Sequence, residues 1–311
     1  MKKYIYNYNY RECEESLVTL EQKYLFNSTG QIRTTLFSNF KFKPDISWFI
    51  KGRLEIIVSK PTFIELVSSV KEKKLITEEF NILLISEKGI KNSKMNGKKK
   101  AKELGMIIDG ECNFINPINI FGFMIIDNKW YFGRYEANDM KWKKYSKKPY
   151  SYSSSLPQNI SKTLVNIASC GNKNIKLIDP CCGVGTVLLD ANYNGYNIEG
   201  VEINESVALS ATKNLKFYKV NINVINDDLK NVSKKYDVAI IDLPYDNFCH
   251  ITEENLNDLI SNIKLFASKF VFISGKCIDG ILKFHNYKIT ETCGVSKNDN
   301  NKIKRIITIC E

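Results

Sequence analysis

The sequence predicts an α/β protein in two parts: an α+β N-terminal region, and a C-terminal domain built on a doubly wound parallel sheet. Its 311 residues are enough for two hydrophobic cores. Beyond a polar stretch at 141–157, expected strands and helices alternate with short links, as in a parallel sheet. Charge is also divided: residues 1–150 hold 27 Lys and Arg against 17 Asp and Glu, and the remainder holds 18 against 17. We expect an N-terminal region at 1–146, a linker at 147–160 and a C-terminal domain at 161–311.

The N-terminal region is expected to mix helices and strands. Residues 13–26 repeat apolar positions at helical spacing and carry acids in the first turn, which predicts a helix. Strands are predicted at 54–60 and 81–86. A helix opening at Pro61 follows the first strand, and a lysine-rich loop leads from the second into another helix. Two strands around an Asp-Asn turn at 118–136 predict a β-hairpin.

The C-terminal domain is expected to alternate strands and helices from residue 174 onward. Its last two strands, separated by a polar turn, predict a closing antiparallel hairpin. The expected strands cover residues 174–180, 196–203, 221–227, 236–244, 269–275, 287–292 and 302–310, and the expected helices follow the turn at 183–186 or cover 206–218 and 253–264.

Composition excludes several classes of protein. The nine cysteines show no CxxC spacing and there are only two histidines, so ligands for a zinc or iron–sulfur site are too few, and we expect no metal. Reduced, mostly buried thiols are the expectation. No apolar run approaches the roughly 20 residues that cross a bilayer, and the N-terminus lacks the apolar segment of a secretory signal. The sequence therefore predicts a cytoplasmic protein with no membrane partner.

Acidic side chains follow three successive predicted strands of the C-terminal domain. Asp179 ends the first strand, Glu202 ends the second, and Asp227 and Asp228 follow the third. Ligands of open α/β sheets bind at the carboxyl ends of the strands, so these acids are expected beside one crevice. Glu202 could accept hydrogen bonds from both hydroxyls of a ribose, and either Asp227 or Asp228 could meet an adenine amine.

The turn after Asp179 carries Gly183 and Gly185, but neither the three-glycine dinucleotide fingerprint nor a Walker lysine. Together with the acids it resembles the class I S-adenosylmethionine-dependent methyltransferases, over most of residues 155–311. The resemblance implies that Asp179 and the glycines surround the methionine part, Glu202 holds the ribose, and Asp228, in preference to Asp227, meets the adenine. The implied cofactor is S-adenosyl-L-methionine, and its implied binding residues are Asp179, Cys181, Gly183, Gly185, Thr186, Glu202, Ile203, Asp227 and Asp228.

A four-residue turn, Asp242-Leu243-Pro244-Tyr245, ends the fourth predicted strand of this domain. It resembles the (D/N/S)PPY motif of methyltransferases that act on exocyclic amines of nucleobases, although Leu243 stands where proline is commoner. The resemblance implies that Asp242 and the Leu243 carbonyl hold the N–H groups of the base. Pro244 would fix the backbone, and an extruded base would stack on Tyr245. These four residues are the expected catalytic set.

The stretch before the first C-terminal strand points to RNA. Residues 147–169 resemble the lead-in segment of THUMP-containing tRNA guanine-N2-methyltransferases, with Asn166 and Ala168 in matching positions and Lys148 where arginine is usual. The resemblance implies that residues 1–146 form a ferredoxin-like and THUMP RNA-binding region. The basic charge of the N-terminal half independently favours a polyanion partner.

Two stretches, 91–102 and 141–150, are rich in lysine, and the second interleaves lysines with Trp and Tyr. Such a composition suits phosphate contacts and base stacking. The expected RNA-binding residues are Lys98, Lys99, Lys100, Lys143, Lys144, Lys147 and Lys148.

Taken together, these features predict an S-adenosylmethionine-dependent enzyme that methylates the N2 amine of a guanosine in tRNA, with position 10 favoured by the resemblance. The expected partner is tRNA, and a monomer is favoured. Two other functions stay open. A DNA amino-methyltransferase shares the four-residue motif but is expected to carry a target-recognition insertion, and an RNA-binding scaffold could keep the fold without activity.

Overall fold

The computed structural model describes residues 3–28, 34–86, 89–90, 95–152, 155–243, 252–296 and 304–311. The chain divides into two compact units. Unit 1 comprises Met1–Asn9 and Arg33–Asp139, and unit 2 comprises Tyr10–Ile32 and Met140–Glu311. This division differs from the expected N-terminal region at 1–146, because residues 10–32 and 140–146 group with unit 2.

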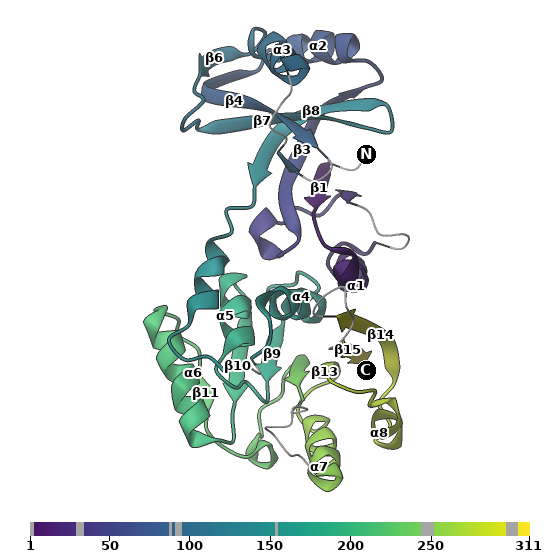
Figure 1. The fold of residues 1–311 in the computed structure, drawn as a ribbon, viewed down its shortest axis with the longest axis vertical. Helices are drawn as coiled ribbons and strands as arrows, with labels where there is room; N and C mark the ends of the chain where they lie inside the picture. The colour runs from purple at the N-terminus through teal and green to yellow at the C-terminus, as the bar shows by residue number, and fades with distance from the viewer. Residues whose placement is uncertain are drawn as a thin grey trace. The chain divides into compact units, whose positions relative to one another are not determined.

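Unit 1 is a mixed sheet in the order β2-β1-β3-β8-β7-β4-β5, with β6 paired to β4. Helices α2 and α3 lie over one face of this sheet, as Figure 1 shows, and an apolar cluster that includes Leu66, Phe80 and Leu104 joins them to it. Its elements are β1 (Tyr4–Tyr8), β2 (Thr35–Ser38), η2 (Pro44–Ile46), β3 (Ile50–Lys60), α2 (Phe63–Glu72), β4 (Ile76–Ser86), β5 (Gly89–Ile90), α3 (Met95–Gly105), β6 (Asp109–Cys112), β7 (Asn119–Ile126) and β8 (Lys129–Ala137).

Local sequence signals account for much of unit 1. Thr62 caps α2, accepting a hydrogen bond from the Glu65 N–H while the Glu65 side chain accepts from the Thr62 N–H. The predicted hairpin is confirmed: Asp127 and Asn128 both have positive φ, 47° and 59°, as a two-residue turn between twisted strands requires. Strands β1, β2, β5 and β6 were not predicted.

Unit 2 is a seven-stranded sheet in the order β11-β10-β9-β12-β13-β15-β14. Five neighbouring strands pair in parallel, and β15 runs antiparallel to both β13 and β14. The predicted class I fold, with its last strand antiparallel, is therefore confirmed. Its strands are β9 (Lys176–Asp179), β10 (Asn197–Val201), β11 (Val224–Ile225), β12 (Val238–Asp242), β13 (Lys269–Ser274), β14 (Ile289–Ser296) and β15 (Lys304–Cys310).

Helices and short 3-10 turns complete unit 2. They are η1 (Glu12–Glu14), α1 (Glu15–Phe26), η3 (Lys141–Lys147), α4 (Gln158–Ser169), α5 (Thr186–Tyr193), α6 (Glu205–Phe217), η4 (Leu229–Asn231), α7 (Glu253–Ile263) and α8 (Asp279–Phe284). The strand order reverses at β9, so the crevice expected of such a sheet opens at the carboxyl ends of β9 and its neighbours.

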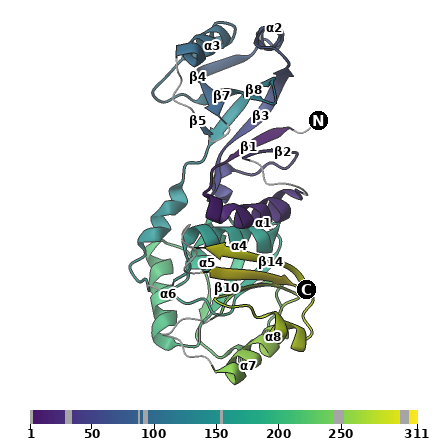
Figure 2. The same cartoon turned by 45° about the vertical axis from the view of Figure 1, so that its right-hand side comes forward.

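Helix α1 is the N-terminal contribution to unit 2. It packs on α4 and β14 (Figures 1 and 2). The fully buried Glu21 of α1 accepts a hydrogen bond of 2.8 Å from the Asn166 side chain of α4, and Lys23 pairs with Glu291 of β14. Asn166, one of the two matching positions in the segment at 147–169, thus anchors α1.

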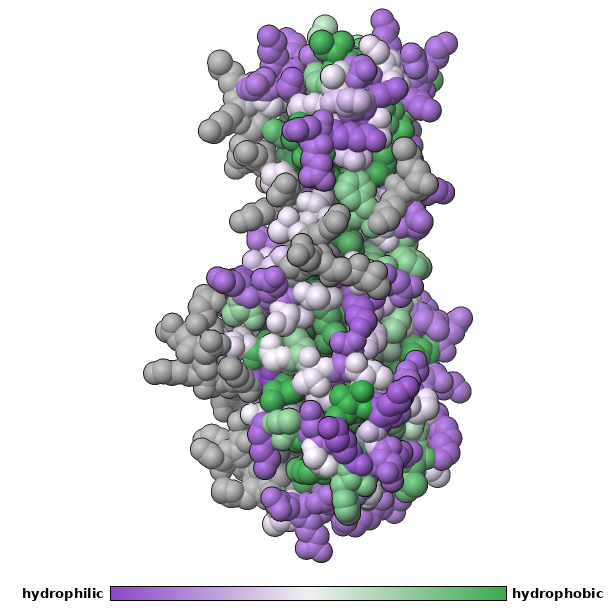
Figure 3. Space-filling view, turned by 90° about the vertical axis from the view of Figure 1, so that its right-hand side faces the viewer, coloured by the Kyte–Doolittle hydropathy of each residue, from purple (hydrophilic) through white to green (hydrophobic). Residues whose placement is uncertain are grey.

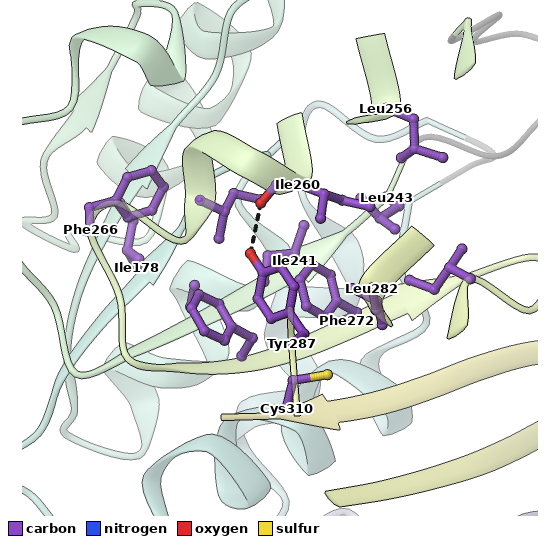
Figure 4. Packing of buried hydrophobic residues seen from close by; sticks show 14 of the residues in the cluster. Ile178, Ile241, Leu243, Leu256, Ile260, Phe266, Phe272, Leu282, Tyr287 and Cys310 are labelled. Atoms are coloured by element: carbon purple, nitrogen blue, oxygen red, sulfur yellow. Dashed lines mark hydrogen bonds between the residues drawn. The ribbon is translucent and has the colours of Figure 1, made fainter. Parts of the chain in front are cut away.

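One apolar cluster fills the space between the sheet of unit 2 and helices α7 and α8. It includes Ile241 and Leu243 from the β12 end, Ile260 from α7 and Leu282 from α8, and the Tyr287 hydroxyl donates to the Ile260 carbonyl at 2.7 Å (Figure 4). Figure 3 shows hydrophilic side chains spread over one face of the molecule, with hydrophobic ones in small areas. Among the described residues, no helix has both the length and the apolarity to span a membrane.

Candidate active site

A cavity of about 680 Å³ opens in unit 2 at the carboxyl ends of β9, β10, β11 and β12. The walls come from these strand ends, from the linker before α4, and from α7. Lining residues are Tyr152, Ser155, Leu156, Asp179, Pro180, Cys181, Cys182, Gly183, Val184, Thr186, Val187, Glu202, Ile203, Asn204, Val207, Asp227, Asp228, Leu229, Lys230, Asp242, Leu243, Asn255, Asp258, Leu259 and Asn262.

Asp179, the last residue of β9, brings a buried carboxylate to the cavity. Burial raises the pKa of this carboxyl well above its usual range. The hydrogen bond from the Cys181 N–H, 3.3 Å long, lowers the pKa, while the nearby charges of Asp242 and Glu202 raise it further. Three carboxyl groups from three different strands therefore share one electrostatic environment, and a cationic ligand would relieve their repulsion.

The turn between β9 and α5 needs its two glycines. Gly183 has φ +53° and Gly185 has φ +83°, conformations that side chains rarely tolerate. The Gly183 N–H donates to a Glu202 carboxylate oxygen at 3.0 Å, so the turn is tied to the end of β10. Gly185 lies outside the cavity lining: it precedes α5, and a Cβ there would contact Ala211 of α6.

Glu202 follows β10 and joins the two loops of this cavity wall. One carboxylate oxygen accepts from Gly183 and the other accepts from the Asn204 N–H at 3.0 Å. Each oxygen retains a further lone pair that can accept from a ligand hydroxyl. The neighbouring Ile203 is 72% exposed while lining the cavity, which leaves an apolar face suited to a flat ring.

Asp227 and Asp228 both line the cavity after β11, but their side chains make different local hydrogen bonds. One oxygen of Asp227 accepts from the Asp228 N–H at 2.7 Å and from the Asn231 side chain at 2.6 Å. Asp228 caps the short turn η4 by accepting from the Lys230 N–H at 3.0 Å. Both positions place a carboxylate at the cavity.

The acceptor turn begins where β12 ends. Asp242 is the last residue of β12, and Leu243 is 3% exposed, with its side chain in the core beside Leu256 of α7 (Figure 4). The Leu243 N–H donates to the Ile273 carbonyl of β13 at 2.9 Å, a bond that proline could not make. A proline ring would restrict the backbone at this position, whereas Leu243 is held by this hydrogen bond and by the burial of its side chain. Pro244 and Tyr245 lie outside the described residues.

The Cys181 thiol lines the cavity and stays protonated and neutral. Burial raises the pKa of Cys181 well above its usual range, and the charges of Asp179, Glu202 and Asp242 raise it further. Within the described ranges, no group of three or more His, Cys, Asp or Glu residues is arranged to hold a metal ion.

Sequence reasoning missed two walls of the cavity. The linker contributes Tyr152, Ser155 and Leu156, and α7 contributes Asn255 and Asp258 among others. The helical period of α7 was visible in the sequence, but the face that meets the cavity depends on how α7 packs against β12. No local signal marks it.

The lysines expected to bind RNA occupy different settings. Lys98 and Lys99 are exposed on α3, whereas the Lys100 ammonium lies 4.0 Å from the centre of the Phe63 ring. Lys143, Lys144 and Lys147 are exposed on η3. Lys148 is half-buried: burial lowers the pKa of its ammonium, while the charge of Asp190 raises it. The expectation of base stacking is wrong for Trp142 and Tyr145, which are 1% and 5% exposed.

Part of the chain that holds this cavity matches a known family. The family model described as "UPF0020: RMKL-like, methyltransferase domain" matches residues 146–270. This range contains β9 to β12 and every cavity-lining residue. Residues 146–270 are thus similar to a methyltransferase domain. The cavity and the Asp242-Leu243 turn both lie within this matched range.

Relatives and solved structures resemble this chain at low identity. The tRNA (guanine(10)-N2)-dimethyltransferase of Methanothermobacter thermautotrophicus is 26% identical over 32% of this chain, and the enzyme of the same name from Pyrococcus abyssi is 26% identical over 29%. The matched segments span only 30% and 27% of those two relatives. The crystal structure of TrmN from Thermus thermophilus aligns over 99% of both chains with a TM-score of 0.48 and 10% identity.

Proposed function

We propose that the protein transfers a methyl group from S-adenosylmethionine to the exocyclic N2 amine of a guanosine in tRNA, with position 10 as the target. The observation that carries the proposal is that Asp179, Glu202 and Asp242, from three strands of a methyltransferase domain, line one cavity with the Leu243 turn. The substrate comes from the two relatives named as guanine-10 N2-dimethyltransferases.

The residues of the cavity fit S-adenosylmethionine. The buried Asp179 carboxylate, whose pKa is raised in the ligand-free cavity, suits the cationic methionine end of the donor. Glu202 suits the ribose hydroxyls, and the exposed Ile203 suits one face of the adenine. Asp228, or Asp227, would accept from the adenine amine. The donor, when bound, supplies a methyl group on a positively charged sulfur.

The acceptor turn would orient the guanine amine. The amine lone pair is delocalised into the base, so hydrogen-bond acceptors that fix the N–H directions favour attack. Asp242 would accept from one N–H and later hold the proton that the amine loses, or pass it to water, and the Leu243 carbonyl would accept from the other. The hydrogen bond from the Leu243 N–H to the Ile273 carbonyl holds the backbone just before that carbonyl. Stacking on Tyr245 remains a prediction from the sequence.

The distribution of positive charge along the chain supports RNA as the partner. The N-terminal half holds most of the net charge of +11, and exposed lysines on α3 and η3 can contact phosphates. We propose that unit 1 is an RNA-binding region of the THUMP kind and that the enzyme works as a monomer in the cytoplasm, where tRNA is processed.

Methyl transfer to defined transcripts tests the proposal. The full-length protein, radiolabelled donor and a tRNA transcript with guanosine at position 10 should yield labelled N2-methylguanosine after nuclease digestion. The matched control is the same transcript with inosine at position 10, which lacks only the N2 amine and should take up no label. Equal labelling of both transcripts would contradict the target, and label in DNA alone would contradict RNA as the substrate.

A further inference from the structure

Two lysine-rich segments of unit 2 meet beside the methyltransferase cavity. One is η3 with the linker after it, residues 141–152, and the other is the C-terminal half of α6. The hydroxyl of Tyr218, the residue that ends α6, donates to the Lys144 carbonyl at 2.6 Å. The Tyr145 ring packs edge-on against Tyr218, with ring centres 4.8 Å apart. These contacts anchor η3 at the end of α6 through the buried Tyr145 ring and leave the lysines of η3 exposed.

A second anchor holds the linker. Asn214, fully buried on α6, accepts a hydrogen bond of 3.0 Å from the Tyr150 N–H and donates to the Tyr150 carbonyl at 2.8 Å. The same side chain donates to the Val184 carbonyl, in the glycine turn, at 3.0 Å. One amide therefore ties the linker to both α6 and the cavity wall, which fixes the course of the chain from η3 to the cavity.

Every formal charge in the sequence of these two segments is positive. Residues 141–152 contain five lysines, and residues 211–219, from the C-terminal half of α6 and the two residues after it, contain three; neither range contains Asp or Glu. Lys143, Lys144 and Lys213 are exposed. The rest of the C-terminal half is not basic, since residues 151–311 without this α6 segment hold 15 Lys and Arg against 17 Asp and Glu. The positive charge is thus concentrated on this surface.

Exposed aromatic rings lie among these lysines. Phe217 of α6 is 62% exposed, Tyr150 is 40% exposed, and Tyr152 is 50% exposed. The Lys213 ammonium lies 5.3 Å from the centre of the Tyr150 ring, and Tyr152 lines the cavity itself. Phe217 stands one helical turn after Lys213, on the same side of α6. Charge and rings therefore continue from η3 to the mouth of the donor site.

We propose that this surface, defined by Lys143, Lys144, Tyr150, Tyr152, Lys213 and Phe217, binds a single-stranded segment of the RNA substrate and leads the target nucleotide into the cavity. Lysines beside solvent-exposed rings suit a strand whose phosphates and unstacked bases alternate. A base paired within a duplex offers no face to such rings, and a base must leave its stack before methylation. The inference rests on the proposed function, because it takes the substrate to be RNA.

Substitutions on α6 test this surface in the full-length protein. Lys213→Glu with Lys216→Glu removes positive charge, and Phe217→Ala removes a ring. The control is Lys276→Glu with Lys283→Glu, an equal change of charge on exposed lysines near α8. Binding of an unmodified tRNA transcript is followed by fluorescence anisotropy over a range of salt, and donor binding is followed by calorimetry.

The double charge reversal should weaken tRNA binding about tenfold and make the slope of log K against log salt shallower by roughly 1 to 2. Phe217→Ala should weaken it by about fivefold or more. Donor affinity and the control pair should match the wild type. Equal weakening by the α6 pair and the control pair, or wild-type tRNA binding by the α6 variants, would overturn the inference. Binding to anionic lipid vesicles is measured as well, and α6 variants that lost this binding alone would also overturn the inference.

Wild-type methyl transfer, measured in parallel, separates the two proposals. If the wild type methylates tRNA and the α6 variants bind tRNA normally, this surface is refuted and the proposed function stands. If the α6 variants lose tRNA binding but the wild type transfers no methyl group to any tRNA, the surface stands and the proposed function fails.

Discussion

The two walls of the cavity use their acidic residues differently. On the wall proposed to hold the methyl donor (the donor wall), Asp179 and Glu202 accept hydrogen bonds from backbone N–H groups of the loops that surround them. On the wall proposed to face the guanine (the acceptor wall), the hydrogen bond of Leu243 to β13 and the burial of its side chain hold the turn that carries Asp242. The donor-wall acids thus hold the loops of the site in place, whereas the position of Asp242 is set by its neighbours.

This difference predicts separable effects. Changes at the donor wall should alter donor affinity, and changes at Asp242 should alter turnover while donor affinity stays close to the wild type. If substitutions in both walls changed donor affinity and turnover to the same extent, the two walls would not have separate roles.

The largest effect is expected at Asp242. Asp242→Ala removes the group that would orient the amine and take up its proton, so methyl transfer to tRNA should fall by about 10²- to 10⁴-fold. Donor affinity, measured by calorimetry, should stay within a few-fold. Asp258→Ala, a carboxylate of the α7 wall, is the control and should retain most activity. A comparable loss in both variants would remove the special role of Asp242.

A smaller effect is expected at Asp179. Asp179→Asn removes the negative charge that would face the donor, so donor affinity should fall about 10- to 100-fold, as expected for loss of a charge-assisted hydrogen bond. Because a buried carboxylate with a raised pKa destabilises the ligand-free fold when it ionises, the variant should unfold at the same or a higher temperature in neutral buffer without donor. Unchanged donor affinity would place the methionine end elsewhere.

The raised pKa of Asp179 also predicts a pH dependence. Since its folded-state pKa lies above its unfolded value, the stability it contributes is full below that unfolded value and is lost as pH rises through the folded pKa. Ligand-free protein should therefore lose stability over this range, while donor binding tightens and releases protons. Calorimetry in buffers of different ionisation enthalpy measures the release. Asp179→Asn should abolish it, and release that persisted in this variant would assign the proton to another group.

The smallest effect is expected at Leu243. Leu243→Pro restores the residue commoner in the motif but removes the N–H that donates to Ile273, so the free energy of unfolding should drop by about 1–3 kcal/mol. Leu243→Met, which keeps the N–H and a similar volume, should cost less than about 1.5 kcal/mol. Chemical denaturation compares the two. A proline variant as stable as wild type would show that this hydrogen bond contributes little.

Much of the fold could be predicted because local and global signals agree. Strand–helix alternation after residue 174, the Asp127-Asn128 turn and the capping residues of α2 all act over a few residues. Strand β1 was missed because all five of its residues are buried, including Asn7, so no alternation marks it. Helix α4 is buried almost all round and carries Lys162 and Asn166 inside, which hides its apolar face.

The candidate site was predictable where residues lie at strand ends, and not where it depends on packing between distant elements. Asp179, Glu202 and Asp242 follow from the topology of a parallel sheet, which brings strand ends to one edge. The linker wall depends on the Asn214 clamp, which joins residues 64 positions apart. The placement of α1 in unit 2 depends on its packing against α4 and β14, which includes the buried pair of Glu21 with Asn166, and no short-range signal reveals it.

Mass spectrometry of ribonuclease fragments of total tRNA, from cells with and without the gene, tests most directly whether donor and guanine amine meet in this cavity. The account predicts that N2-methylated guanosine at position 10 disappears on deletion and returns with the wild-type gene, but not with the gene encoding Asp242→Ala. Unchanged N2-methylguanosine at position 10 in the deleted strain, or full restoration by Asp242→Ala, would contradict it.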